Sequence, residues 1–221
     1  MTKDQSNAAV SDTSSWNLVI ATVRRLAQAF AWCCALTLIA STTLVAAGRA
    51  SAAPNDAADP LLPAVVPGPS GWAPKFPFPY DANRKDVTDA DITAEREMCQ
   101  WFKPQYRELV RQIDRLGFNL AEANNDWTVG QIQAQADNVA ANIDQTENYL
   151  APRAQALTQV LDPANDTHFA IYEGEAFYRL WTHLSNVGVG IKARNTSWVN
   201  GPSVERVKHW GSQIHRSHVC D

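Results

Sequence analysis

Residues 106–120 read YRELVRQIDRLGFNL, and this stretch decides the fold class. Its large apolar side chains recur at spacings of three and four residues, so they share one face of an α-helix. These residues are Tyr106, Leu109, Ile113, Leu116 and Leu120. Charged and amide side chains hold most of the positions between them, as on a helix face that meets solvent. The stretch therefore predicts a long amphipathic helix that packs against other helices.

The same spacing recurs in three later segments, which predicts three more helices. The second helix is expected over residues 129–161, the third after a cap at residues 165–167, and the fourth after a loop at residues 195–202. No segment shows the alternation of a half-buried strand. Four helices with short connections favour an all-α fold, an up-down-up-down four-helix bundle.

Polar and proline residues set the expected helix boundaries. Asp126 or Thr128 is expected to cap the second helix, and Ser203 is expected to cap the fourth. Pro104 and Pro152 lie inside the first and second helices, where each removes a backbone hydrogen bond. We therefore expect the long first and second helices to be kinked.

Two cysteines, Cys99 and Cys220, lie within the predicted bundle. Cys99 is early in the first helix, and Cys220 follows the end of the fourth. In a bundle whose helices alternate in direction, these two points lie at the same end. We therefore predict that one Cys99–Cys220 disulfide closes the bundle, as exported proteins allow. The alternative is a pair of buried free thiols.

A segment typical of protein export precedes the bundle. Two arginines stand before an uncharged apolar run, residues 26–47, and small residues follow as far as Ala52. A positive flank, an apolar core and a small-residue cleavage site define a secretory signal peptide. We expect residues 1–52 to be this signal, cleaved between Ala52 and Ala53. The alternative is a retained membrane anchor, since about 20 apolar residues span a bilayer. The long N-terminal region is similar in style to those of exported actinobacterial proteins.

A proline-rich linker is predicted over residues 53–80, which hold eight of the 12 prolines of the chain. Proline fixes φ and donates no backbone hydrogen bond, so this stretch is expected to be extended. Four aromatic residues near its end either pack back onto the bundle, residues 81–221, or dock a partner. They are Trp72, Phe76, Phe78 and Tyr80.

The charge of the chain narrows the classes of partner. The formal net charge is −4, and residues 1–52 contain more basic than acidic side chains, so the remainder is more acidic still. Nucleic-acid binding needs a basic face. We therefore expect no nucleic-acid partner and no docking on anionic lipid head groups.

Histidines are confined to the last third of the chain and supply the candidate metal ligands. His215 and His218 share a helix face close to Cys220, and His209 lies further up the same helix. Imidazole and thiolate suit zinc or copper, but Arg216 and the expected disulfide argue against a metal there. A haem would need an axial ligand, for which the available side chains are Met98, Tyr172, His168 and His183. We predict no cofactor.

Glu173 and Glu175 are the candidate catalytic carboxylates, on either side of Gly174 in the predicted third helix. Paired carboxylates can hydrolyse glycosides. Residues two apart on a helix point to different sides, however, so a solvated face is the simpler interpretation. We predict no catalytic residue.

These observations favour an exported, non-enzymatic helical domain that is an interaction or accessory protein of the cell envelope or extracellular space. The expected partner is a protein or an envelope component, bound by the linker aromatics or by a groove of the bundle. The first alternative is a carrier of a small ligand or a metal (zinc or haem) that uses the histidine-rich C-terminal third. The second is an enzyme that acts on cell-wall glycans. Membrane contact is expected only if the apolar run is retained as an anchor.

Overall fold

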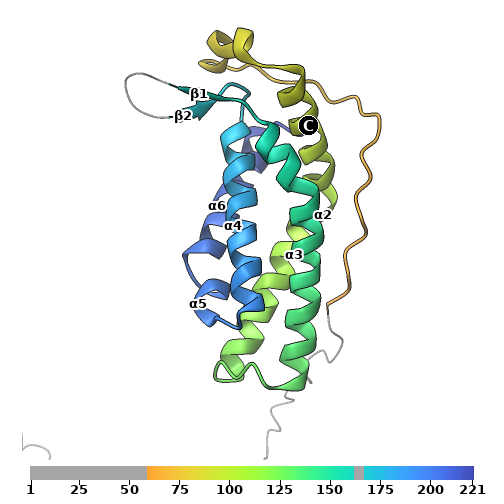
Figure 1. Cartoon of the computed structure of the whole chain (residues 1–221), viewed down its shortest axis with the longest axis vertical. Coiled ribbons are helices and arrows are strands. Elements are labelled where there is room, and N and C mark those ends of the chain that lie inside the picture. Colours follow the sequence, from red (N-terminus) through yellow and green to blue (C-terminus); the bar gives the residue numbers. More distant parts are fainter. Residues whose placement is uncertain (1–58, 162–166) are drawn as a thin grey trace, which may run out of the picture. The chain divides into compact units, whose positions relative to one another are not determined.

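The computed structural model describes residues 59–161 and 167–221, and these residues are mostly helical (Figure 1). The predicted helical class is confirmed, whereas the signal peptide and its Ala52/Ala53 cleavage site lie outside the described residues. In chain order the elements are the 3₁₀ helix η1 (Tyr80–Asp86), α2 (Asp89–Glu122), α3 (Gly130–Ala156), β1 (Gln159–Leu161), β2 (Thr167–Phe169), α4 (Gly174–Lys192), α5 (Thr196–Val199) and α6 (Pro202–Ser217).

Helix α2 begins at a capping box. The Thr88 hydroxyl accepts from the Asp91 backbone N–H at 3.2 Å, and the Asp91 carboxylate accepts from the Thr88 N–H at 2.8 Å. Two donors that would otherwise lack partners at the helix start are thereby satisfied. The helix then continues through Pro104, and α3 continues through Pro152. Neither proline breaks its helix.

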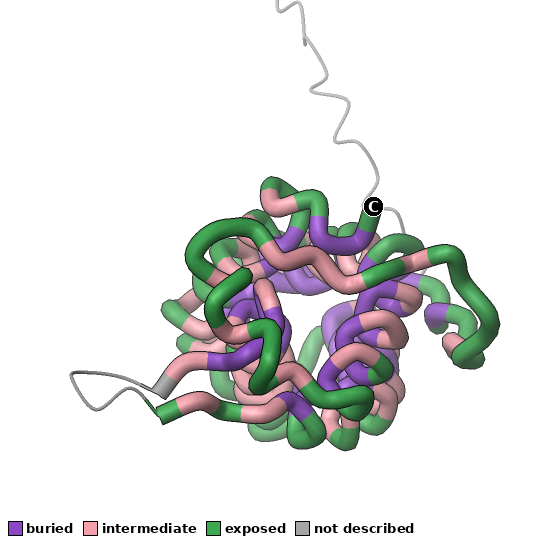
Figure 2. Tube along the Cα trace, turned by 90° about the horizontal axis from the view of Figure 1, so that it is seen from above, coloured by how far each residue is buried: buried purple, intermediate pink, exposed green. Residues whose placement is uncertain are grey.

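The core lies between the four long helices, whose buried positions face inward (Figure 2). α3 packs against α2 and α4, and α4 packs against α6. The face predicted from residues 106–120 is buried as expected, with Leu109, Ile113, Leu116 and Leu120 each no more than 1% exposed. Gly188 lets α3 approach α4 closely, because a Cβ there would lie 2.7 Å from Ile143 Cγ2.

The predicted boundary between the second and third helices is wrong. α3 ends at Ala156 rather than at residue 161, and β1 and β2 form an antiparallel hairpin that pairs Gln159 with Phe169. Leu157 is buried in extended backbone, and Ala170 N–H donates to Thr158 C=O at 3.3 Å. A short apolar run cannot distinguish a helix end from a strand by its spacing. The third helix accordingly starts at Gly174, not after residue 167.

The predicted caps of α3 and α6 are also wrong. Asp126 accepts from the Thr128 N–H at 2.8 Å in a turn, and the residue that precedes α3 is Val129, without a side-chain cap. α6 begins with Pro202 at its first position, so Ser203 already lies within the helix. Proline suits that position because the N–H it lacks would have no helical partner. The expected loop at residues 195–202 contains the short helix α5.

The predicted disulfide is confirmed. Cys99 in α2 is bonded to Cys220 beyond α6, with Cα atoms 5.2 Å apart. This bond joins two parts of the chain that are 121 residues apart in sequence. It therefore ties the end of the chain to the early part of the first long helix.

Residues 59–77 form no helix or strand, and part of this segment is buried against the bundle. Asp59 and Leu62 are 1% and 8% exposed. The segment runs beside α2 and α3 before the chain turns into η1 (Figure 1). Within residues 59–161 and 167–221, no helix combines the length and apolar character needed to cross a bilayer.

Candidate ligand-binding site

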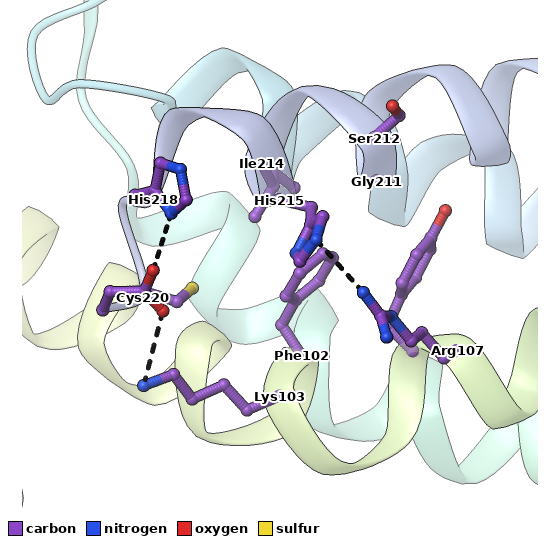
Figure 3. Close-up of a pocket in the computed structure, with 11 residues that line it drawn as sticks. Phe102, Lys103, Arg107, Gly211, Ser212, Ile214, His215, His218 and Cys220 are labelled. Atoms are coloured by element: carbon purple, nitrogen blue, oxygen red, sulfur yellow. Dashed lines mark hydrogen bonds and ion pairs between the residues drawn. The ribbon is translucent and has the colours of Figure 1, made fainter.

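A groove of about 410 Å³ lies between α2 and α6, at the end of the bundle that carries the disulfide (Figure 3). Both helices supply side chains at spacings of three and four, which places each set on one face. α2 contributes Phe102, Lys103, Tyr106 and Arg107, and α6 contributes Gly211, Ser212, Ile214 and His215. His218, Cys220 and Asp221 close one end.

Aromatic rings form the apolar side of the groove. The Phe102 and Tyr106 rings stack with centroids 4.7 Å apart and an interplanar angle of 15°. Gly211 leaves room for them, since a Cβ at that position would lie 2.0 Å from Tyr106 Cζ. The Tyr106 hydroxyl donates to Val207 C=O at 3.2 Å. Burial, with Asp114 nearby, raises the pKa of Tyr106 to about 12, so the ring is neutral at physiological pH.

Lys103 and Arg107 bring positive charge to the same groove. Arg107 Nη2 lies 3.1 Å from His215 Nε2 (Figure 3). A guanidinium only donates, so His215 accepts at Nε2 in this hydrogen bond. Among the described residues no carboxylate forms a salt bridge with Arg107. Its charge is therefore available to an anion in the groove.

Asp221 closes one end of the groove. Its carboxylate lies 2.8 Å from His218 Nδ1 and 3.9 Å from Lys103 Nζ (Figure 3). The hydrogen bond from His218 is the main cause that lowers the pKa of Asp221, and Lys103 and Lys75 add to it. Lys75, which belongs to the proline-rich segment, also donates a hydrogen bond to the His218 carbonyl. Asp221 is 64% exposed, so solvent weakens its interaction with Lys103 and it offsets the charge of Lys103 only in part. It forms no salt bridge with Arg107.

A second hollow, of about 270 Å³, lies next to this groove at the disulfide. Cys220, Lys103 and Asp221 line both. Trp72 lines the second hollow, and its indole N–H donates to Val219 C=O at 2.7 Å. The proline-rich segment is thus part of the wall beside the groove.

The histidines named as metal candidates divide between two places. His215 and His218 line the groove, whereas His209 packs edge-on against Trp210 with ring centroids 4.9 Å apart. In the described part of the chain, no three histidine, cysteine, aspartate or glutamate side chains are grouped as metal ligands. Cys220 is committed to the disulfide.

None of the side chains named as possible haem ligands lines the groove. Met98 is fully buried in the apolar core. His168 Nε2 lies 3.2 Å from Asn83 Nδ2, close to the hairpin. His183 lies on α4, where burial, with Arg206 and Arg179 nearby, lowers its pKa.

The four aromatic residues of the linker have different surroundings. Phe76 packs under the Arg84 guanidinium at 4.8 Å, and Tyr80 meets Tyr172 edge-on at 5.2 Å. Trp72 is partly buried beside the disulfide. Phe78 is 90% exposed. These residues do not form one continuous strip.

Glu173 and Glu175 have different surroundings. Glu173 is buried in left-handed backbone (φ 64°) just before α4, and Gln213 donates to its carboxylate at 2.8 Å. Burial raises the pKa of Glu173. Glu175 lies nearer solvent and pairs with Arg179 at 3.4 Å.

Glu95 is a notable buried carboxyl that the sequence patterns did not single out. It is 0% exposed, and neither oxygen meets a hydrogen-bond donor among the described residues. Burial raises its pKa well above the usual value, and Glu173 and Asp91 raise it further. A signal was present: Glu95 stands three and four residues before Met98 and Cys99, on the buried face of α2.

Comparison with known proteins gives no match: no protein-family model fits the chain, and no curated protein or solved structure is significantly similar to it.

Proposed function

We propose that this protein is an exported, non-enzymatic binding domain of the cell envelope or extracellular space, and that its site is the groove between α2 and α6. The ligand is a small organic anion with an aromatic or other flat apolar body. The observation that carries this proposal is the placement of Arg107, without a carboxylate partner in the described chain, beside the stacked Phe102 and Tyr106 rings.

The chemistry of the groove supports this ligand class. Aromatic side chains bind flat apolar groups, and a guanidinium binds carboxylates and sulfonates through parallel N–H donors. Small-molecule sites are usually mostly apolar hollows with a few polar groups that orient the ligand. The volume of about 410 Å³ lies within the range of such sites.

Titration calorimetry of the full chain in mild detergent tests the proposal, with naphthalene-2-sulfonate as the probe. We expect saturable binding at one site, and weaker binding of the neutral analogue 2-naphthol. Arg107→Ala should weaken sulfonate binding at least tenfold, since a charge-assisted hydrogen bond contributes about 1.5–3 kcal/mol.

Lys208→Ala is the matched control, because Lys208 is a cation of α6 that pairs with Asp114 rather than lining the groove. It should leave sulfonate binding unchanged. Equal affinity of the wild-type protein and Arg107→Ala for the sulfonate would contradict the proposed site.

Export is the second part of the proposal. The Arg-flanked apolar run before Ala52 supports it, and a long-range disulfide is typical of oxidising compartments. The intact mass of the protein recovered outside the cytoplasm should correspond to residues 53–221, less two hydrogens for the disulfide. A mass that includes residues 1–52 would instead favour the membrane anchor.

We also infer that the four long helices alternate in direction as an up-down-up-down bundle. The packing of α3 against α2 and α4, and of α4 against α6, supports this topology. So does a disulfide that joins the early part of α2 to the segment after α6. In this topology the groove lies between the first and last helices of the bundle.

A further inference from the structure

Residues 59–68, which we call the strap, lie along α2 and α3 and are held by amide side chains. The strap runs from Asp59, beside Asn138 of α3, to Gly68, beside Gln100 of α2. It is therefore antiparallel to α2 and parallel to α3. The α2–α6 groove belongs to a different pair of helices, so the binding of the strap is independent of the proposed ligand.

Asparagine and glutamine side chains donate to five carbonyl groups of the strap. The donors come from both helices, so the strap lies over the seam between them. The bonds are Asn138 to Asp59 C=O (2.9 Å), Gln112 and Asn142 to Pro60 C=O (3.1 Å each), Gln145 to Leu62 C=O (3.1 Å), Gln105 to Pro63 C=O, and Gln100 to Gly68 C=O (2.7 Å).

We call these amides, together with Gln135, the amide row. On α3 they recur at spacings of three and four residues, at positions 135, 138, 142 and 145, and therefore share a helix face. Asn142 Nδ2 also donates to Gln112 Oε1 at 2.7 Å, and both side chains are buried. Buried amides need such partners, since each unsatisfied one costs about 1–3 kcal/mol.

Two strap residues are recognised by their side chains as well as their backbone. The Asp59 carboxylate is fully buried and receives Arg115 Nη1 at 2.6 Å and Gln135 Nε2 at 3.1 Å. Leu62 is 8% exposed, and its N–H donates to Asn142 Oδ1 at 2.8 Å. Leu61, by contrast, is 63% exposed.

The row suits a proline-rich peptide because it binds mainly carbonyl groups. Proline has no N–H to donate, but its carbonyl accepts like any other. Extended polyproline segments have no internal hydrogen bonds and present those carbonyls to a binding surface. The row therefore fits the pattern Asp-Pro-x-Leu-Pro, with selectivity at the aspartate and the leucine.

We propose that the amide row is a recognition site for extended peptides of the pattern Asp-Pro-x-Leu-Pro, filled here in cis by residues 59–63 and able to bind the same segment of a second copy of this chain. An identical element can be exchanged between two copies with little change in its contacts. The connection after the strap permits release, because Gly68 and Gly71 have no neighbouring atom within 4 Å of a would-be Cβ.

The test cuts the covalent connection and asks whether the strap stays bound. A protease site is placed between Ser70 and Gly71, and an affinity tag is inserted after Ala53, so that the tag stays on the chain whether or not residues 1–52 are removed. After cleavage, residues 71–221 should remain on the affinity resin through the strap. A synthetic peptide of residues 59–68 in excess should then release them.

A peptide with the changes Asp59→Asn and Leu62→Asp should release nothing at the same concentration. In the cleaved protein, Asn138→Ala should speed dissociation several-fold and Arg115→Ala at least tenfold. Lys208→Ala, outside the strap's surroundings, should have no effect. Asn138 is only partly buried, so its substitution tests the row even if Arg115→Ala fails to fold.

Two results would overturn the proposal. The first is release of residues 71–221 upon cleavage while circular dichroism shows the helices intact, since the strap would then be held only by its covalent connection. The second is retention that neither the synthetic peptide nor the two variants alter. Exchange between copies is measured by mixing cleaved tagged protein with cleaved untagged protein, and capture of no untagged bundle would exclude it.

Discussion

Glu95 places a carboxyl group in the apolar core, where ionisation is costly. Its pKa is raised, so between the unfolded value of about 4.5 and the higher folded value the native state binds more protons than the unfolded state. Stability therefore falls as pH rises through that window, by up to about 1.4 kcal/mol per pH unit. The contribution of the protonated Glu95 carboxyl to stability is therefore fully present only at pH values below the pKa of Glu95 in the unfolded chain.

Glu95→Gln should remove this pH dependence, because glutamine does not titrate. Urea unfolding at pH 5, 6 and 7 should show a free energy of unfolding that declines more steeply for the wild-type protein than for the variant. Glu122→Gln is the control, since Glu122 is exposed at the end of α2. Parallel pH profiles for wild type and Glu95→Gln would show that Glu95 is ionised in the folded protein.

Single residues of the candidate site were only partly predictable. The shared helix face of His215 and His218 follows from their spacing, and both line the groove. Arg107 and Phe102 were not singled out, because the groove depends on how α2 meets α6 and spacing within one helix carries no such information. Gly211 lies on the buried face of α6 with Val207 and Ile214, but its closeness to Tyr106 depends on that same meeting.

At the scale of elements, the start of α2 depends on a local signal. Thr88 and Asp91 exchange hydrogen bonds in a capping box, and loss of a capping hydroxyl typically costs about 1 kcal/mol. Thr88→Ala should lower the free energy of unfolding by about that amount in urea titration. Cys99 lies ten residues after Asp89, the first residue of α2. Fraying at the start of this helix should therefore also expose backbone near the disulfide to hydrogen exchange.

Thr93→Ala makes the same chemical change at an exposed position inside α2. It should be neutral or slightly stabilising, because alanine has the higher helix propensity. If both substitutions had the same effect on stability, the capping box would contribute nothing beyond propensity.

Elements whose apolar residues recur regularly over several turns were predictable, whereas short elements were not. The buried face of α2 extends over several turns, so its period identifies it. Residues 157–161 offer only three apolar side chains, which fit a helix end or a strand equally well. What selects the hairpin is tertiary: Asp91 accepts a hydrogen bond from the Thr158 N–H, and the buried Leu157 ends α3 there. The burial of Asp59 against α2 and α3 is likewise a long-range contact that local composition does not encode.

At the scale of the whole molecule, the disulfide is relevant to three features: the proposed export of the chain, the packing of its helices and the lining of the groove. It joins α2 to the segment after α6, and its Cys220 lines both hollows. Its pairing could be predicted because only two cysteines follow the proposed signal and because the expected alternation of the helices would bring them together. The long-range contacts of the strap had no comparable two-residue signal.

Removal of the disulfide should destabilise the whole bundle. A link between residues 121 apart restricts the unfolded chain strongly, and the chain-entropy model gives a stabilisation of about 5 kcal/mol. That is a large share of the roughly 5–15 kcal/mol that holds a typical domain folded. The double variant Cys99→Ser/Cys220→Ser should therefore unfold at a much lower urea concentration, or be unfolded without urea, when followed by circular dichroism.

A reducing agent should shift the wild-type transition toward that of the double variant and leave the variant itself unchanged. The second comparison checks that the reducing agent acts through the Cys99–Cys220 bond, since the full chain also contains Cys33 and Cys34. A loss below about 1 kcal/mol in the double variant would mean that packing alone holds the two ends together. A fold that survives the loss of the bond while sulfonate binding disappears would assign the disulfide chiefly to the shape of the groove.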